Sequence, residues 1–290
     1  MRLPAVALAA ALLATMAPAA DPEPRYHPDA LQALAAMEQA AAGVKDYTMM
    51  LVKRELRGKE LDDEETMVVK WQRPQKIYLK EIEGPREGQE VLYATGWNKN
   101  RIKVHHGSFP GITLNLDPYG NLAMSHAHHA VPEISLVRFV DLVLDNVKRA
   151  QAKNVGTAAV VDHVTLWGRS ATKLEMTTPP TGTSPTIKKG ETLWDVARAT
   201  GQDMYVILHA NLRRQWRQAD HPEPGDAVIV PEFYAGRLVL WVDDELHLPL
   251  QADLFDHEGN LYEHYEHRDL KINVGLGPAD FDPKNPAYHF

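Results

Sequence analysis

The sequence predicts an α+β protein: a curved antiparallel sheet with helices packed on one face, interrupted by a small inserted βααβ module. Three observations support this fold class. Consecutive strand patterns separated by turn residues indicate hairpins, which join antiparallel neighbours. Two stretches repeat apolar residues at the helical spacings of three and four. A compact segment at residues 186–231 interrupts the strand pattern, which resumes at Arg237.

The first twenty residues have the features of a secretory signal. Arg2 supplies a positive charge, residues 5–16 are almost uniformly apolar, and a small-x-small cleavage pattern ends at Ala19. The apolar run is shorter than the ~20 residues that a membrane-spanning helix requires. We therefore expect residues 1–20 to be removed and the mature protein to be exported to the periplasm in soluble form, without a transmembrane span.

The composition narrows the classes of function. The chain contains no cysteine, which excludes disulfides, a thiolate nucleophile and lipid attachment to an N-terminal cysteine. Its 39 acidic residues exceed its 31 lysines and arginines, so no broad basic face is expected and nucleic acid is not a predicted partner. No pattern in the sequence indicates a cofactor.

The first half of the chain predicts a helix followed by a meander. Residues 27–44 form an amphipathic helix, because Leu31, Leu34, Met37 and Ala41 recur on one face. Turn-forming and charged residues then separate a series of short strands. These strands are predicted at residues 47–56, 65–71, 76–82, 90–94 and 101–104.

The second half predicts another helix and further hairpins. The helix opens at Pro132-Glu133 and has apolar positions from Ile134 to Val147. Strands follow at residues 160–167 and 171–177, around a turn at Gly168-Arg169-Ser170, and later at residues 237–242, 248–255 and 261–274.

The interruption of this pattern divides the chain. Residues 179–185, with the sequence PPTGTSP, are typical of a linker. We therefore predict a host domain at residues 21–178 and 232–290, the linker at 179–185, and an inserted module at 186–231.

The inserted segment contains several motifs in a fixed order. Residues 186–197 read TIKKGETLWDVA, residues 199–201 read ATG, residues 206–211 end at Asn211, and residues 224–231 read PGDAVIVP. In this order they resemble a LysM domain, with its strand, helix, turn, helix and strand. Gly190 suits a sharp turn, Thr192 can cap a helix, and Gly201 can end one.

The LysM resemblance implies a partner and a site. LysM domains bind glycans that contain N-acetylglucosamine, which in bacteria usually means peptidoglycan. In that family the sugar lies in a shallow groove between two loops. The corresponding residues here are Gly190, Glu191, Thr192 and Leu193 on one side, and Asn211, Leu212, Pro224 and Gly225 on the other.

The segment departs from the LysM pattern at residues 212–223, which are longer and more basic than usual. Trp216 could stack on a sugar ring as an accessory contact, or it could pack against the host domain. The neighbouring arginines could bind carboxylates of the peptide stems, or they could form a solvated face. Trp194 is expected to pack rather than to bind.

The remainder of the chain resembles a bacterial envelope family called domain of unknown function 1571. The motifs are WQRPQKIYLK at residues 71–80, LWVD at 240–243 and FDPKNPAYHF at 281–290, and the resemblance omits the insert. That family is similar to the LolA/LolB superfamily of lipoprotein carriers, which implies a half-barrel sheet wrapped around helices. Such a fold can leave an apolar cavity for acyl chains, here beside strand residues such as Met49, Leu51, Val68 and Val69, or its core can be filled.

One cluster could carry metal chemistry. Ser125-His126-Ala127-His128-His129 would place His126 and His128 on one face of a strand, as in half of the zinc site of some peptidoglycan endopeptidases. The matching third ligand is absent by motif, so these two histidines remain weak candidates and no metal is predicted. The alternative is a polar loop before the second helix.

Two functions remain open from the sequence. The first is a non-catalytic, cell-wall-associated protein that binds peptidoglycan through the module, while the host domain binds lipid, lipoprotein or protein. The second is a wall-processing hydrolase that uses the module for targeting. Motifs of the common serine and cysteine hydrolases are not found, so no catalytic residue is predicted.

Overall fold

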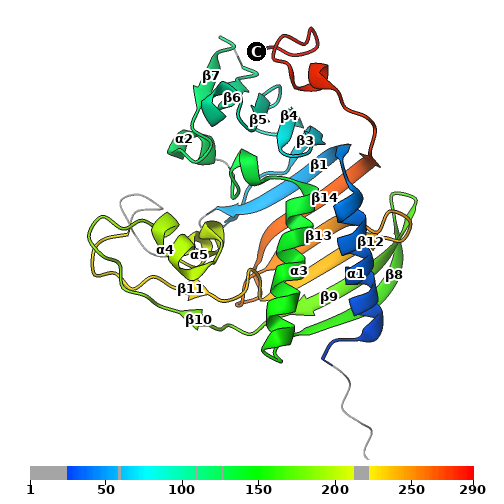
Figure 1. Ribbon diagram of the computed structural model, residues 1–290, viewed down its shortest axis with the longest axis vertical. Coiled ribbons are helices and arrows are strands. Elements are labelled where there is room, and N and C mark those ends of the chain that lie inside the picture. The colour runs from blue at the N-terminus through cyan, green and yellow to red at the C-terminus, as the bar shows by residue number, and fades with distance from the viewer. Residues whose placement is uncertain (1–24, 58–59, 109, 126, 212–221) are drawn as a thin grey trace, which may run out of the picture.

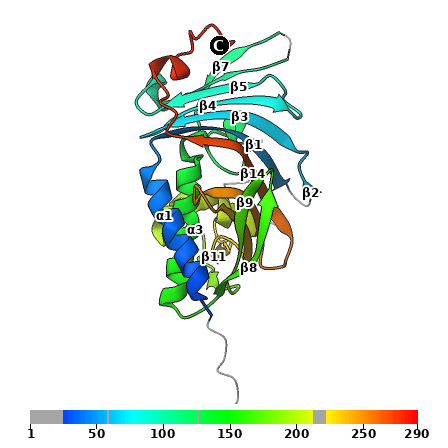
Figure 2. The same cartoon turned by 90° about the vertical axis from the view of Figure 1, so that its right-hand side faces the viewer.

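The computed structural model describes residues 25–57, 60–108, 110–125, 127–211 and 222–290. Its centre is a twelve-stranded antiparallel sheet in the order β7-β6-β5-β4-β3-β1-β14-β13-β12-β9-β8, with the short β2 paired to β1. Two long helices, α1 and α3, lie on the concave side of this sheet (Figures 1 and 2). The predicted α+β class and curved antiparallel sheet are therefore confirmed.

The strands of the sheet come from both halves of the chain. In chain order they are β1 (Asp46–Arg57), β2 (Glu60–Leu61), β3 (Glu65–Gln72), β4 (Lys76–Glu83), β5 (Glu90–Ala94), β6 (Ile102–His105), β7 (Thr113–Leu116), β8 (Thr157–Leu166), β9 (Arg169–Thr177), β12 (Arg237–Asp243), β13 (Pro249–Phe255) and β14 (Leu261–Ile272). Strand β1 joins the halves, because Leu51 pairs with Met67 on β3 and with His267 on β14.

Both long helices bury one apolar stripe. Helix α1 (Pro28–Gly43) begins with proline at its first position and buries Ala30, Leu34, Met37 and Ala41. Helix α3 (Leu136–Ala152) packs beside it against the strands of the second half. In the part of the chain that the structure describes, no helix is long and apolar enough to cross a membrane.

The start of α3 differs from the prediction. A 3₁₀ turn, η2 (Val131–Glu133), comes first, and the α-helix begins only at Leu136. The reason is the cap: the Ser135 hydroxyl accepts a hydrogen bond from the backbone N–H of Arg138 at 3.0 Å. Pro132 therefore lies within the 3₁₀ turn and does not start the helix.

Several turns and short elements also differ from the prediction. The β8–β9 turn consists of Trp167 and Gly168, both with positive φ, so β9 begins at Arg169 and not at Ala171. Elements not predicted are β2, η1 (Asn98–Asn100), β7, α2 (Asn121–Met124) and η3 (Pro278–Phe281). The predicted linker at 179–185 contains β10 (Gly182–Thr183), which pairs with β11 (Val230–Pro231).

The segment 186–231 contains two short helices, α4 (Leu193–Thr200) and α5 (Met204–Ala210). A bridge between Thr186 and Ala227 brings the start and end of the segment together. Its small core also includes Ala130 from the host, which is completely buried there. The segment therefore packs on the host chain next to η2.

The C-terminal residues cover the opposite, convex face of the sheet. A 3₁₀ turn, η3 (Pro278–Phe281), places Phe281 against Tyr78 and Leu92. The ring of Tyr288 stacks on Tyr78 with 3.9 Å between centroids. Neighbouring strand residues point to opposite faces, so this tail leaves the concave face free for other packing.

Candidate ligand cavity

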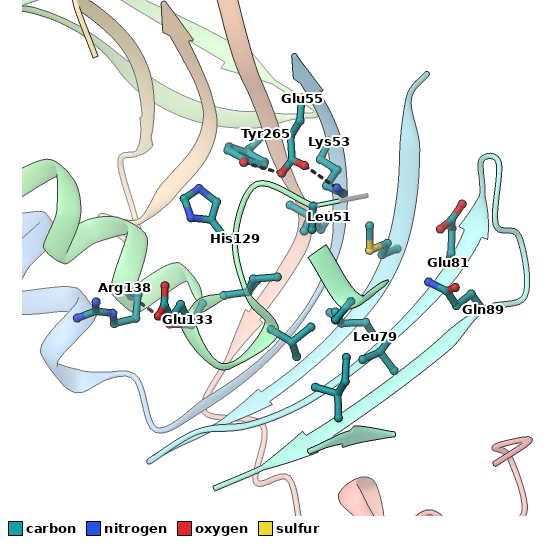
Figure 3. Close-up of a pocket in the computed structure, with 18 of the residues that line it drawn as sticks. Leu51, Lys53, Glu55, Leu79, Glu81, Gln89, His129, Glu133, Arg138 and Tyr265 are labelled. Carbon is teal, nitrogen blue, oxygen red and sulfur yellow. Dashed lines mark hydrogen bonds and ion pairs between the residues drawn. The ribbon is translucent and has the colours of Figure 1, made fainter. Parts of the chain in front are cut away.

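A cavity of about 390 Å³ lies between the concave face of the sheet and the segment that leads into α3 (Figure 3). Its floor is apolar because alternate residues of six strands point into it. These floor residues are Met49, Leu51, Met67, Leu79, Val91, Ile102, Val104, Leu114 and Leu116. Met49 and Leu51 were predicted for such a cavity, whereas Val68 and Val69 do not line it.

The roof of the cavity is formed by residues 122–125 and 127–142, which include most of α2, η2 and the first turns of α3. Its apolar residues facing the cavity are Leu122, Ala123, Ala127, Val131, Ile134, Leu136, Phe139 and Leu142. Leu122 is 64% exposed and Leu114 of the floor is 37% exposed, so apolar side chains reach the surface at this side. The cavity is thus enclosed by apolar side chains from both sides and is open along one edge.

Charged side chains close one end of the cavity. Lys53 lies 3.0 Å from the carboxylate of Glu55 and 3.5 Å from that of Glu65. Arg86 continues the chain, at 2.6 Å from Glu65 and 3.2 Å from Glu81. Each cation is therefore held between two carboxylates, which compensates the cost of burying these charges.

A second polar cluster lies between the cavity and the segment 186–231. The carboxylate of Glu263 accepts hydrogen bonds from the hydroxyl of Tyr234 at 2.9 Å and lies 3.0 Å from Nδ1 of His128 and 3.3 Å from Nε2 of His129. Glu55 accepts from the hydroxyl of Tyr265 at 2.9 Å and from the backbone N–H of His128. The cluster thus fastens the roof to β1 and β14.

Burial and hydrogen bonding act in opposite directions on the pKa values of this cluster. Burial alone would raise the pKa of Glu263, but hydrogen bonds from His128 and His129 outweigh it and hold the pKa at about 2. Burial opposes the charge of His129, yet its hydrogen bond to Glu263 and the nearby carboxylates raise its pKa to about 9. His129 is therefore positively charged at neutral pH.

This cluster contains His128, one of the two histidines considered as weak metal candidates. Both ring nitrogens of His128 are occupied, Nδ1 by Glu263 and Nε2 by the carbonyl of Leu56 at 2.7 Å. Residues 128 and 129 form bends and residue 127 has no regular secondary structure, so the described part of this stretch is not a strand. His126 lies outside the described residues. Among the residues described, no group of three or more potential ligands could hold a metal ion.

The predicted glycan-binding loops lie side by side. The backbone N–H of Gly225 donates to the carbonyl of Ile187 at 2.9 Å, which joins the start of one loop to the other. Gly190, Pro224 and Gly225 are exposed, and both glycines have positive φ.

Other predicted contact residues serve the internal packing of the segment. The hydroxyl of Thr192 accepts from the N–H of Asp195 and caps α4, and Leu193 is completely buried. The amide of Asn211 bonds the backbone of Ile207 and Ile229. The side chains of Thr192, Leu193 and Asn211 therefore stabilise the internal structure of the segment.

The remaining predicted residues are distributed as follows. Glu191 accepts a hydrogen bond from the backbone N–H of Lys188 at 2.9 Å. Leu212 and Trp216 lie outside the described residues. Trp194 packs edge-on against Tyr119 of the host and Tyr205 of α5, in agreement with the expected packing role.

The fold and cavity together define an α+β protein with an apolar pocket under a curved sheet. The chain belongs to the family described as "Protein of unknown function (DUF1571)", whose model matches residues 44–202 and 209–290. The resemblance drawn from the sequence is thus confirmed. Contrary to the prediction, the family match does not omit the segment 186–231, because it includes residues 186–202 and 209–231.

Solved structures with similar architecture share little sequence with this chain. MucB is 12% identical with a TM-score of 0.44, over 88% of this chain and 63% of that chain. Lipoprotein LppX of Mycobacterium tuberculosis is 13% identical with a TM-score of 0.43, over 88% and 99%. A LolA superfamily protein of Nitrosomonas europaea is 11% identical with a TM-score of 0.34, over 87% and 97%. This chain therefore spans less than two thirds of the length of MucB. None of the curated protein sequences compared with this chain matches it.

Proposed function

We propose that this protein is an exported, non-catalytic binding protein whose cavity holds an apolar ligand, such as an acyl chain of a lipid or lipoprotein. The cavity carries this proposal. Its volume of about 390 Å³ falls within the ~300–1,000 Å³ of small-molecule sites. Its floor and roof are apolar, while its polar residues gather at the ends.

The energetics favour an apolar occupant. A dry space between apolar side chains lacks the contacts that a filled core would make. Water gains little from entering such a space, because it finds few hydrogen-bond partners there. Each methylene group that a ligand buries contributes about 0.8 kcal/mol, so an acyl chain of moderate length suits this cavity.

Filling the cavity should abolish binding. Val104 of β6 points into it, and the half-buried Ala123 of α2 faces it from above. Val104→Phe and Ala123→Phe should each weaken binding of the uncharged fluorescent probe N-phenyl-1-naphthylamine at least tenfold. The matched control is Lys103→Phe, because Lys103 neighbours Val104 on β6 and points to the other face.

The measurement is a fluorescence titration of the full chain, with circular dichroism to show that each variant is folded. Saturable binding by the native protein and by the Lys103 variant, lost in both filled variants, supports the proposal. Absence of saturable binding by the native protein, or equal binding by folded variants with a filled cavity, would refute it.

We propose as a second function that the segment 186–231 binds peptidoglycan. The adjacent loops at 187–191 and 223–226 support this, since they would form the two walls of a groove whose backbone groups could bond acetamido groups. The resemblance to LysM domains indicates the class of ligand, a glycan that contains N-acetylglucosamine. The side chains of Leu193 and Asn211, which pack or bond within the segment, would then shape the groove and not touch the sugar.

Glycan binding can be tested with the complete protein. Retention on insoluble peptidoglycan sacculi should be competed by oligomers of N-acetylglucosamine. Amide resonances that shift in titration should lie at residues 188–193 and 223–226. Retention that oligomers do not compete, or shifts confined to other regions, would exclude this site. Release of soluble muropeptides from the sacculi would favour the alternative, a wall-processing hydrolase.

A further inference from the structure

The charged end of the cavity contains more negative than positive groups. Three carboxylates, of Glu55, Glu65 and Glu81, share the two cations Lys53 and Arg86. Glu55 and Glu65 are 4% and 3% exposed, so bulk water screens them little. Neither cation is available to a new anion unless it leaves a buried carboxylate without its partner.

The lining of the whole cavity has the same balance. Five acidic side chains line it, those of Glu55, Glu81, Glu133, Asp203 and Glu263, against the three Lys or Arg side chains of Lys53, Arg86 and Arg138. Directly behind the lining, Glu65 adds one negative charge, and His128, whose two ring nitrogens both face acceptors, adds one positive charge. With the positively charged His129, the excess is one negative charge. Arg138 is exposed and lies beside Glu133 (Figure 3), and its positive charge favours the ionised form of that carboxyl.

A ligand with an ionised carboxylate therefore meets an unfavourable site. Its charge would lose hydration on entry. It would also face carboxylates that already bind the cations of the lining, and like charges at short range repel strongly in a poorly solvated site. An ammonium group would avoid this repulsion but would still lose its hydration on entry, and the carboxylates of the charged end already pair with Lys53 and Arg86.

One polar side chain at the charged end of the cavity, that of Gln89, can bind a ligand. Gln89 lies next to Glu81 at the edge of the cavity (Figure 3), and its backbone carbonyl accepts from the N–H of Glu81. Among the described residues, its side-chain amide has no hydrogen-bond partner. An amide offers both a donor and an acceptor, which suits an ester, amide or hydroxyl group.

We propose that the cavity selects acyl compounds whose polar end is uncharged, and that Gln89 hydrogen-bonds that end. Free fatty acids are discriminated against by the negative excess of the lining. This inference rests on the proposed binding of an apolar ligand and specifies the class of that ligand.

The test compares three ligands that share a twelve-carbon chain and differ at the polar end. Monolaurin is uncharged, laurate is anionic and dodecylammonium is cationic at pH 7.5. Each displaces N-phenyl-1-naphthylamine from the full chain, below its critical micelle concentration. Monolaurin should displace the probe at a concentration at least tenfold lower than either ion. An equal or stronger effect of laurate or dodecylammonium, or no displacement by monolaurin, overturns the inference.

Variants of Gln89 test the assigned hydrogen bond. Gln89→Leu keeps the size of the side chain and should weaken monolaurin about fivefold relative to the probe, as expected for one hydrogen bond. Gln89→Lys adds a cation and should strengthen laurate relative to monolaurin, whereas Gln89→Glu should weaken laurate further. Unchanged preferences in all three variants would refute the role of Gln89.

The two proposals fail differently. If the probe does not bind, the cavity has no apolar ligand and the proposed function falls. If the probe binds and laurate competes as well as monolaurin, the proposed function stands and only the selectivity is wrong.

Discussion

At the scale of single residues, charged side chains on the concave face of β1 mark the site. Met49, Leu51, Lys53 and Glu55 alternate along the strand, so two charges continue an apolar stripe into the interior. This pattern is visible in the sequence and could have indicated a polar end to the cavity. The partners of the charged residues could not be predicted from the sequence, since pairs such as His128 and Glu263 lie 135 positions apart.

From the sequence, His128 is a weak metal candidate, with a polar loop before the second helix as the alternative, and no metal is predicted. A pair of histidines at positions i and i+2 suits metal binding only if the chain there is a strand and a third ligand is near. Here the chain bends, and His128 and His129 both turn toward one carboxylate. Which partner a histidine meets depends on tertiary packing, which the local sequence does not contain.

The charged cluster predicts how stability depends on pH. The pKa of His129 is raised from 6.5 to about 9, so its contribution is fully present below pH 6.5 and is lost as pH rises through 9. The pKa of Glu263 is lowered from 4.5 to about 2, so its contribution is present above pH 4.5 and is lost as pH falls toward 2. Stability from this pair should therefore be greatest between about pH 4.5 and 6.5.

Removing His129 should flatten the alkaline side of this profile. In urea unfolding, His129→Gln should lose less stability than the native protein between pH 7 and 9.5, by about 1–3 kcal/mol. His163→Gln changes an exposed histidine on β8 and should retain the native profile. A His129 variant with the same alkaline loss as the native protein would show that the pair does not stabilise the fold.

At the scale of elements, the long periodic stretches were predicted well and the short ones were not. Helix α1 was predicted within one residue at each end, because its apolar spacing and its proline are local signals. Strand β7 and helix α2 have only four residues each, too few for a period to be read. They form because the sheet and the roof hold them, and both of them line the cavity.

The contact between α5 and the roof can be tested directly. The hydroxyl of Tyr205 accepts from the backbone N–H of Ala130 at 3.0 Å and contacts the sulfur of Met124 at 3.6 Å. Tyr205→Phe leaves this buried N–H without its partner and should reduce the free energy of unfolding by about 1–3 kcal/mol.

The control for this experiment is Tyr119→Phe. The Tyr119 hydroxyl bonds Glu133 at 3.1 Å, but the residue is 40% exposed, so water can replace the hydrogen bond. Its loss should cost less than ~0.5 kcal/mol. Equal effects of the two changes in urea unfolding would mean that the segment 186–231 does not stabilise the roof.

At the scale of the whole molecule, the pairing of β1 with β14 determines the architecture. This pair brings residues 46–57 beside residues 261–272 and closes one continuous sheet from two halves of the chain. Hairpins could be predicted from local turns, but a pairing over more than two hundred residues has no local signal. The half-barrel could be expected only from the family resemblance.

The cavity follows from this large-scale arrangement. Strands β1 and β3–β7 form the floor of the cavity, and the roof lies against them. Helices α1 and α3 cover the remaining strands (Figure 2). The segment 186–231 supports the roof from the other side, through Ala130 and Tyr205. A ligand in the cavity should therefore stabilise both the roof and this segment, by about 2.7 kcal/mol at a concentration of 100 times its dissociation constant.

The central claim is that the cavity holds an apolar ligand in its natural setting. Native mass spectrometry of the protein purified from its own cell envelope, without detergent, tests it most directly. The native protein and Lys103→Phe should carry an added mass that organic extraction releases as an acyl compound, and folded Val104→Phe should not. A native protein that carries no such mass, or a Val104 variant that carries the same mass as the native protein, would contradict the account.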